Sequence, residues 1–347
     1  MRKLIYILIL LNFLLPIRVN ASQLEVPEAP LSAQEYMPQD EETFAQGLLY
    51  IIKSAISAFQ PEIAQTLRIC LSLIAVIILM SFLESISQYA CTTVQLAGVV
   101  IISLILLQEA KSMIILGTDT VRQLSEYAKV FLPVITAALA SQGYVTTSSA
   151  LYAGTAIFNT VLSGLISGIL VPMIYIYLCV CIANNALHEQ MLENLSKFVK
   201  WLMTWGLKII LYVFTGYISI TGVISGSADA TAVKAAKIAI TGVVPVVGGI
   251  ISDASEAVLV GAGVMKNSVG LYGLYAIISI CIGPFLQIGA HYLLLKATAA
   301  AGSVLSTKSS VSILKDFTTA MGIVLAMTGT LCILLLISIV CFMKGVA

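Results

Sequence analysis

The sequence predicts an all-α polytopic membrane protein with about seven transmembrane helices, within a range of six to eight, and a central re-entrant hairpin broken by proline and glycine. Hydrophobic residues make up 59% of the 347 residues, and charged residues only 10%, against about 25% in soluble domains. The mean hydropathy is +1.01. Uncharged apolar runs that are long enough to cross a bilayer recur along the chain.

Residues 1–21 have the three parts of a secretory signal peptide. Arg2 and Lys3 precede an apolar run at residues 4–15, and Ala21 ends a cleavage site of small residues. We expect cleavage after Ala21, and an uncleaved signal anchor is the alternative. Either outcome places the residues that follow outside the cytoplasm.

Residues 22–65 form the second expected unit, an acidic extracytoplasmic segment with an amphipathic helix. Between residues 22 and 52 the chain has six carboxylates, three prolines and no basic residue, which is typical of a disordered linker. From residue 44 to 59 the apolar residues follow helical spacing. This helix is expected to lie on the membrane or on a partner, or alternatively to pack on the bundle of its own chain.

Residues 66–347 form the expected membrane domain. Residues 69–108 contain uncharged runs that fit either two spans or one span and a partial hairpin. Residues 109–129 carry six charged side chains and are interpreted as a loop. The uncharged stretch at 130–187 is long enough for two crossings around the polar patch at 141–150.

Two pairs of glycines, each four residues apart, are candidates for close helix packing. Gly164 and Gly168 lie in the expected span at 155–183, and Gly222 and Gly226 end the span that starts near Trp201. Small residues at this spacing let helix backbones approach closely. We therefore expect one of the two pairs to lie at a contact between helices.

Residues 225–295 form the expected core of the membrane domain, and residues 238–251 within it are unusual. This uncharged run would span only about 21 Å as a helix, against a hydrocarbon core of about 30 Å. Pro245 removes a backbone donor, and Gly248 and Gly249 favour a break. An interrupted backbone is tolerated at membrane depth where it is buried in protein or lines water. The sequence therefore predicts a re-entrant hairpin.

Charged residues flank the predicted hairpin. They are Asp229, Lys234 and Lys237 before the break, and Asp253 and Glu256 after it. Because exposing ionisable groups to lipid costs several kcal/mol, these residues are candidates for a pore lining or for a proton or ion site. The alternative is a structural role, since carboxylates cap the first turn of a helix and lysines reach the headgroups.

Two further spans are expected after the hairpin. Residues 269–295 form the first, in which Pro284 should kink the helix beside the hairpin, and residues 317–343 form the last. Residues 296–316, rich in Ser, Thr and Ala, are interpreted as the loop between them. The basic groups at 111–129, 197–200 and 296–315 would all be cytoplasmic only if residues 69–108 cross once and the hairpin is re-entrant.

The sequence contains no motif for catalysis. His188 and His291 lie in separate segments, and neither belongs to a zinc-binding pattern. There is no phosphate-binding loop, and a net charge of +1 gives no case for nucleic-acid binding. We therefore expect no enzymatic activity, cofactor, bound metal or nucleic-acid partner.

The stretch from residue 227 reads SADATAVKAAKIAITGVVPVVGGIISDASEAVLVGAG and continues through KNSVGLYGLYAIISICIGPF to about residue 295. It resembles the stage III sporulation protein AE family, polytopic membrane proteins of endospore-forming bacteria. The order of signal peptide, acidic segment and multiple spans agrees with this family along the rest of the chain. The resemblance supplies no catalytic residues.

The resemblance implies a protein of the mother-cell membrane that surrounds the engulfed forespore. Its implied partners are the other stage III sporulation membrane proteins of the same operon and a forespore-side partner, in a channel-like complex related to specialised secretion machines. A homo-oligomer is also compatible with the sequence. The alternative is a stand-alone secondary transporter with a substrate site at the broken helix.

Overall fold

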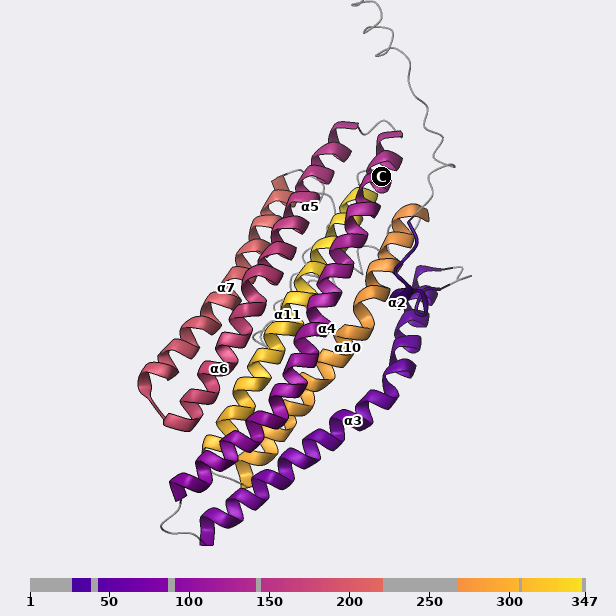
Figure 1. Cartoon of the computed structure of the whole chain (residues 1–347). Coiled ribbons are helices and arrows are strands. Elements are labelled where there is room, and N and C mark those ends of the chain that lie inside the picture. The colour runs from indigo at the N-terminus through magenta and orange to yellow at the C-terminus, as the bar shows by residue number, and fades with distance from the viewer. Residues whose placement is uncertain are drawn as a thin grey trace, which may run out of the picture.

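The computed structural model describes residues 27–38, 43–86, 91–141, 145–220, 268–305 and 308–344, which contain helices and no strand (Figure 1). The helices are α2 (Leu31–Gln34), α3 (Phe44–Ile86), α4 (Cys91–Ser141), α5 (Val145–Leu165), a π-helical turn (Ile166–Leu170), α6 (Val171–Leu187), α7 (Gln190–Ile220), α10 (Ser268–Leu305) and α11 (Lys308–Lys344). The all-α class predicted from the sequence is confirmed.

Six stretches of the described helices are long and apolar enough to cross a membrane. They are Phe44–Leu83, Thr93–Ala138, Ser148–Leu187, Gln190–Tyr217, Val269–Val304 and Ser310–Met343. Helix α5, the π-helical turn and α6 together form one of them. The polytopic membrane class is therefore confirmed, with six spans in the described residues where the sequence predicted about seven.

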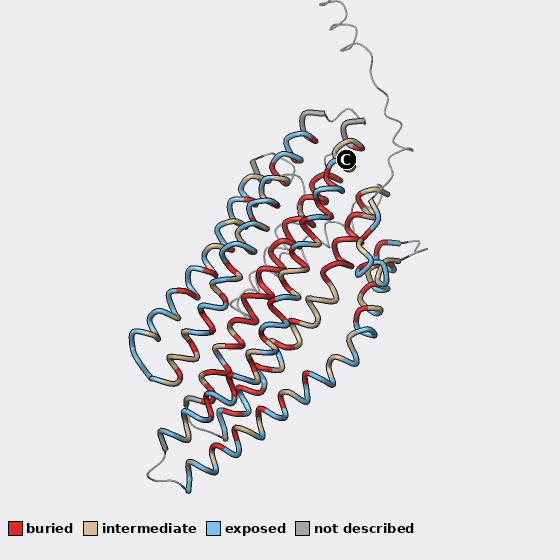
Figure 2. Tube along the Cα trace, in the orientation of Figure 1, coloured by how far each residue is buried: buried red, intermediate tan, exposed pale blue. Residues whose placement is uncertain are grey.

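Helix α11 lies at the centre of the bundle. In its apolar 18-residue window 89% of the residues are buried, against 28% in α3 and 39% in α4, and Figure 2 shows α11 almost entirely in the colour of buried residues. It contacts α4, α5, α6, α7 and α10, whereas α3 packs on α10 and α4. The last span predicted from the sequence is thus the helix around which the others pack.

Successive long helices alternate in direction, so that their ends meet at two ends of the bundle. At the upper end in Figure 1, the Tyr217 hydroxyl of α7 donates to Ala150 O of α5 at 2.6 Å. At the lower end, Gly98 of α4 faces Met80 of α3 and Ser310 of α11. The turn from α6 to α7 also lies at the lower end.

The chain leaves α7 and enters α10 at the same end of the bundle. Helix α7 ends at Ile220, and α10 begins at Ser268, where Gly270 faces Met343 near the end of α11. A re-entrant segment enters and leaves the membrane on the same side, so the helices before and after it must have their adjoining ends on that side. The end of α7 and the start of α10 meet this requirement. The predicted hairpin itself lies outside the described residues. So do the residues singled out there: Asp229, Lys234, Lys237, Pro245, Gly248, Gly249, Asp253, Glu256, Gly222 and Gly226.

The helix predicted at residues 44–59 is the first part of the 43-residue helix α3, which continues through Pro61. Phe44 is buried and stacks on Tyr275 of α10, with ring centroids 5.6 Å apart. Ile51 and Ala55 are buried on the same side. This part of α3 therefore packs on the bundle of its own chain.

The loop predicted at residues 109–129 is wrong, because these residues form the middle of the 51-residue helix α4. Apolar side chains such as Ala110, Met113 and Leu124 recur at helical spacing and are buried, whereas Lys111 and Arg122 are exposed. At 1.5 Å per residue, α4 is roughly 76 Å long, well beyond a hydrocarbon core of about 30 Å. A helix of this length carries charged turns without a loop.

The loop predicted at residues 296–316 is wrong as well, because α10 continues to Leu305 and α11 begins at Lys308. Alanine, the best helix former, dominates the first part of this stretch. The Thr298 hydroxyl donates to Leu294 O at 2.8 Å, and Ser303 donates to Ala300 O at 2.6 Å. These polar side chains are satisfied within the helix, so their presence does not require a loop.

For two further stretches, the structure decides how many times the chain crosses the bundle. Residues 69–108 belong to two antiparallel helices, α3 and α4, so the two-span alternative holds. Residues 130–187 form one crossing and not two, because residues up to Ser141 complete α4. The remainder, from Val145 to Leu187, is one helical unit with a π-helical turn.

Gly164 of α5 and Gly168 of the π-helical turn face away from the described helices. No described atom lies within 4 Å of a Cβ placed on either glycine. They therefore make no close helix contact within the described part of the chain. The packing role predicted for this pair stays a prediction, and it would need a neighbour outside the described residues.

Candidate functional site: a polar cluster between three helices

A histidine inside the bundle joins three long helices. His291 of α10 is 7% exposed, and its Nδ1 lies 3.3 Å from Thr66 Oγ1 of α3. Its Nε2 lies 3.3 Å from Glu109 Oε2 of α4. Thr66 is buried, and the Glu109 side chain is 20% exposed. We call Thr66, Glu109 and His291 the polar cluster.

The cluster lies where the apolar parts of α3 and α4 give way to charged turns. Thr66 precedes the uncharged run at residues 69–83, and Glu109 directly follows the uncharged run at residues 93–108. Because α3 and α4 are antiparallel, these two positions come to the same height. Helix α10 packs on both and brings His291 between them.

The Thr66 hydroxyl allows the imidazole to hold one or two protons. When only Nε2 carries a proton, Nε2 donates a hydrogen bond to Glu109, and the Thr66 hydroxyl donates a hydrogen bond to Nδ1. When both nitrogens carry protons, Nδ1 donates to Thr66 Oγ1, and Thr66 donates to Glu62 O, which lies 3.0 Å away. Both nitrogens keep partners in either state. The cluster thus supplies a hydrogen-bond partner to each ring nitrogen of His291.

A cavity of about 210 Å³ lies between α2, α3, α4 and α10, beside the cluster. Its polar lining consists of Glu62, Asp119, Gln123, Gln287, Ser32, Tyr36 and Thr120, and no described lining residue is basic. Glu62 connects the cavity to the cluster, because its carbonyl faces Thr66 and its side chain interacts electrostatically with His291. The cavity and the cluster are therefore neighbours within the bundle.

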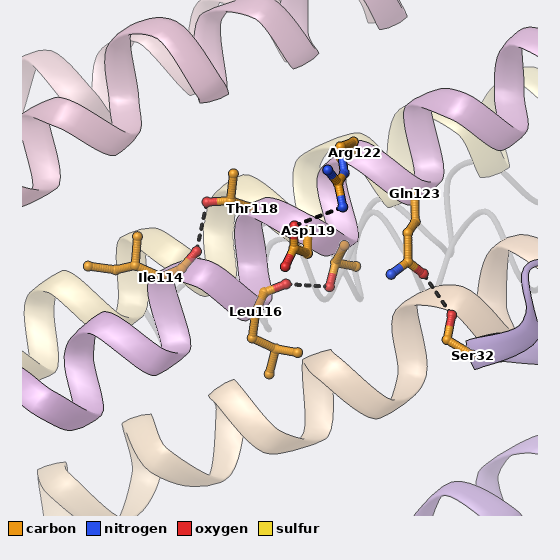
Figure 3. A network of polar contacts seen from close by, with 8 residues as sticks. Ser32, Ile114, Leu116, Thr118, Asp119, Arg122 and Gln123 are labelled. Carbon is orange, nitrogen blue, oxygen red and sulfur yellow. Dashed lines mark hydrogen bonds and ion pairs between the residues drawn. The ribbon is translucent and has the colours of Figure 1, made fainter.

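The segment before α3 closes one side of the cavity. Ser32 Oγ of α2 donates to Gln123 Oε1 of α4 at 2.7 Å, and Figure 3 shows the two side chains pointing toward one another. On the same helix, Asp119 pairs with Arg122 at 3.3 Å (Figure 3). The described N-terminal residues are therefore held on the bundle at the cavity.

Pro284 is the one residue predicted for the pore or the hairpin that falls in the described part of the chain, and it lines this cavity. It lies inside α10, where its missing N–H leaves the carbonyl of Ile280, another lining residue, without its helical donor.

Tyr36 also lines the cavity. Burial, followed by the charges of two nearby glutamates, raises the pKa of Tyr36. The Tyr36 hydroxyl, which is protonated at neutral pH even at its ordinary pKa, is able to donate a hydrogen bond at the cavity.

The polar cluster is not visible in the sequence. His291 belongs to no motif, and Glu109 falls in the residues expected to form a loop. The available signal was a titratable residue at the edge of an apolar run. Which of these residues meet depends on how α3, α4 and α10 pack.

The family described as stage III sporulation protein AE matches residues 33–345, a range that contains all three residues of the polar cluster. The chain belongs to this family. The stage III sporulation protein AE of Bacillus subtilis (strain 168) is 25% identical over 185 residues, which cover 53% of this chain and 46% of that relative. The match thus spans about half the length of the relative. No solved structure matches the chain.

Membership of the stage III sporulation protein AE family supports a role in sporulation. The six long apolar helices support a location in a membrane. The family is one of sporulation membrane proteins and is not known as an enzyme family.

Replacing Glu109 by leucine should destabilise the folded chain by roughly 1–3 kcal/mol, because the buried Nε2 of His291 then loses its partner. Glu109→Gln keeps an acceptor at this position and should cost less. Thermal unfolding of the purified chain in detergent measures both effects. The control is Glu126→Leu, which removes an exposed carboxylate of the same helix and should change stability by no more than about 0.5 kcal/mol. Equal losses for the two leucine variants would contradict the contact.

Proposed function

We propose that the chain is a membrane subunit of a channel or export-type complex between the mother cell and the forespore, required for endospore development after engulfment. Its location in this proposal is the mother-cell membrane that surrounds the forespore. The observation that carries the proposal is the family match over residues 33–345. The polar cluster and its cavity support it, because a chain that served only as an anchor would need no polar interior.

The polar interior suits protons or small cations. Its carboxylates are Glu62, Glu109 and Asp119, and no described lining residue of the cavity is basic. All three carboxylates are partly exposed, and Asp119 and Glu109 are paired with Arg122 and His291. Ionisable groups within membrane helices are functional candidates because they are costly to place in lipid. We infer that this part of the subunit exchanges protons or passes small cations, and that it disfavours anions.

We place the lower end of the bundle in the mother-cell cytoplasm. Lys197, Lys200 and Lys315 lie near this end, and lysine and arginine favour the cytoplasmic side of a membrane. The predicted signal peptide puts the start of α3, at the upper end, on the opposite side. In this orientation α7 ends and α10 begins on the side that faces the forespore.

The proposed partners are the other stage III sporulation membrane proteins of the same operon and a forespore-side partner. A tagged chain, cross-linked and purified from sporulating cells, should bring these proteins with it in mass spectrometry. The same purification from vegetative cells made to express the tagged chain is the control and should recover it without them. Recovery of the chain alone from both cultures would contradict the assembly.

A stand-alone secondary transporter is the second candidate, and the cavity lined by Pro284 beside the titratable His291 favours it. A transporter would move a solute across vesicles that contain only the purified chain. A subunit of an assembly would show no such transport alone and would gain ion conductance only with its partners. Reconstitution with and without the partners therefore separates the two candidates.

A further inference from the structure

We propose that a second polar pocket, at the lower end of the bundle, binds the headgroup of an anionic phospholipid. The pocket has a volume of about 750 Å³ and is lined by residues of α6, α7 and α11 and of the turn between α6 and α7. It shares no lining residue with the cavity beside the polar cluster. The inference rests on the orientation proposed above, in which the lower end lies at the cytoplasmic membrane surface, and it does not depend on the proposed channel function.

The pocket has positive charge that the described residues do not neutralise. Its lining includes three lysines and two carboxylates, which leaves one positive charge in excess. Lys197 pairs with Glu193 at 2.6 Å, whereas no described carboxylate lies within ion-pair distance of Lys200 or Lys315. Both of these lysines are exposed. A headgroup with one net negative charge, such as phosphatidylglycerol, matches this balance.

The second carboxylate of the pocket, Asp316, already has a hydrogen-bond partner in the chain. Asp316 Oδ2 of α11 accepts a hydrogen bond from Asn185 Nδ2 of α6 at 2.8 Å. It also interacts electrostatically with Lys200. Asn184 and Ser312 add an amide and a hydroxyl to the lining, and these groups are able to donate to phosphate or glycerol oxygens. The pocket thus combines cations with neutral donors, as a phosphodiester requires.

Aromatic side chains beside the pocket mark the level of the lipid headgroups. Phe198, Trp201 and Trp205 of α7 form an exposed stack, with successive ring centroids 6.2 and 5.6 Å apart. Tryptophan is enriched where a membrane meets water. Lys197 and Lys200 alternate with these rings along the same two helical turns, so they lie at the depth of the lipid phosphates. The exposed stack provides apolar surface for the acyl chains.

This depth favours a lipid over an acidic segment of a soluble protein. Such a segment would have to enter the headgroup layer, where the negative surface potential of the cytoplasmic leaflet repels it. A lipid of that leaflet is already at the required depth and is present at high local concentration. Basic pockets between membrane helices on this side are a known setting for anionic headgroups.

The test is native mass spectrometry of the purified full-length chain, equilibrated in detergent with equal amounts of phosphatidylglycerol and phosphatidylcholine. The wild-type chain should retain phosphatidylglycerol in preference to phosphatidylcholine. The double variant Lys200→Gln/Lys315→Gln should lower this retention by roughly 30-fold, the effect expected of two lysines near an anionic surface. Lys200→Arg/Lys315→Arg keeps both charges and should retain the lipid.

The matched control is Lys129→Gln/Lys296→Gln, which removes the same charge from exposed lysines outside the pocket and should retain the lipid. Circular dichroism and size exclusion establish that each variant is folded; should the double variant not fold, the single variant Lys315→Gln takes its place. Three results would overturn the proposal: equal retention of both lipids by the wild-type chain, equal loss in the two glutamine pairs, or displacement of the lipid by an acidic peptide at concentrations where inorganic phosphate has no effect.

Discussion

Replacing Gly117 by leucine should lower the stability of the chain and its amount in the membrane, because this glycine is where α4 meets the central helix. A Cβ at position 117 would lie 2.7 Å from Val324 Cγ1 and 3.2 Å from both Met327 Cε and Thr328 Oγ1. These three residues of α11 are fully buried. Val324 is β-branched, so its side chain has little freedom to rotate away. The rest of a leucine side chain would enter the same closed contact.

Overpacking of a core typically costs about 1–3 kcal/mol, a large part of a native stability of about 5–15 kcal/mol. Since Val324, the nearest neighbour of a Cβ at Gly117, has little freedom to move aside, we expect a loss at the upper end of that range. Gly206→Leu in α7 is the control, because no described atom lies within 4 Å of a Cβ at that glycine. Immunoblots of membrane fractions and thermal unfolding compare the two variants. Equal levels and equal stability would contradict the packing of α4 on α11.

The helical class and several of the spans follow from local properties of the sequence. The uncharged run at residues 317–343 predicted a span, and it lies in α11. The ends of the helices were less predictable. Charged and hydroxyl-bearing residues at 109–129 and 296–316 were interpreted as loops, but long helices expose the charges on one side and satisfy the hydroxyls within the helix, as Thr298 does with Leu294 O. Charged residues in the middle of a helix can be assigned to that helix only when the helix is known to be longer than the membrane is thick.

The candidate site was less accessible to sequence reasoning than the fold. Pro284 could be identified because a proline inside an uncharged run is a local signal. The polar cluster could not, because His291 meets Glu109 across 182 positions and Thr66 across 225. These contacts exist only because α10 packs on both α3 and α4. The residues predicted at 229–256 lie outside the described part of the chain, and their roles stay predictions.

A strain that lacks this chain should grow normally but fail to complete spore development after engulfment. The family to which the chain belongs supports a role in sporulation. In the function proposed above, the polar interior between α3, α4 and α10 is the part that would act on protons or cations. Vegetative growth should be unaffected, because the proposed assembly exists only after the forespore has been engulfed.

The proposed role in sporulation is best tested by counting heat-resistant spores from a deletion strain, with and without a reintroduced copy. We expect almost no such spores from the deletion strain, full recovery with the wild-type chain or Gly206→Leu, and lower recovery with Gly117→Leu. Normal spore numbers from the deletion strain would contradict a role in endospore development. A defect confined to the uptake of one solute during growth would contradict it as well and would favour the transporter.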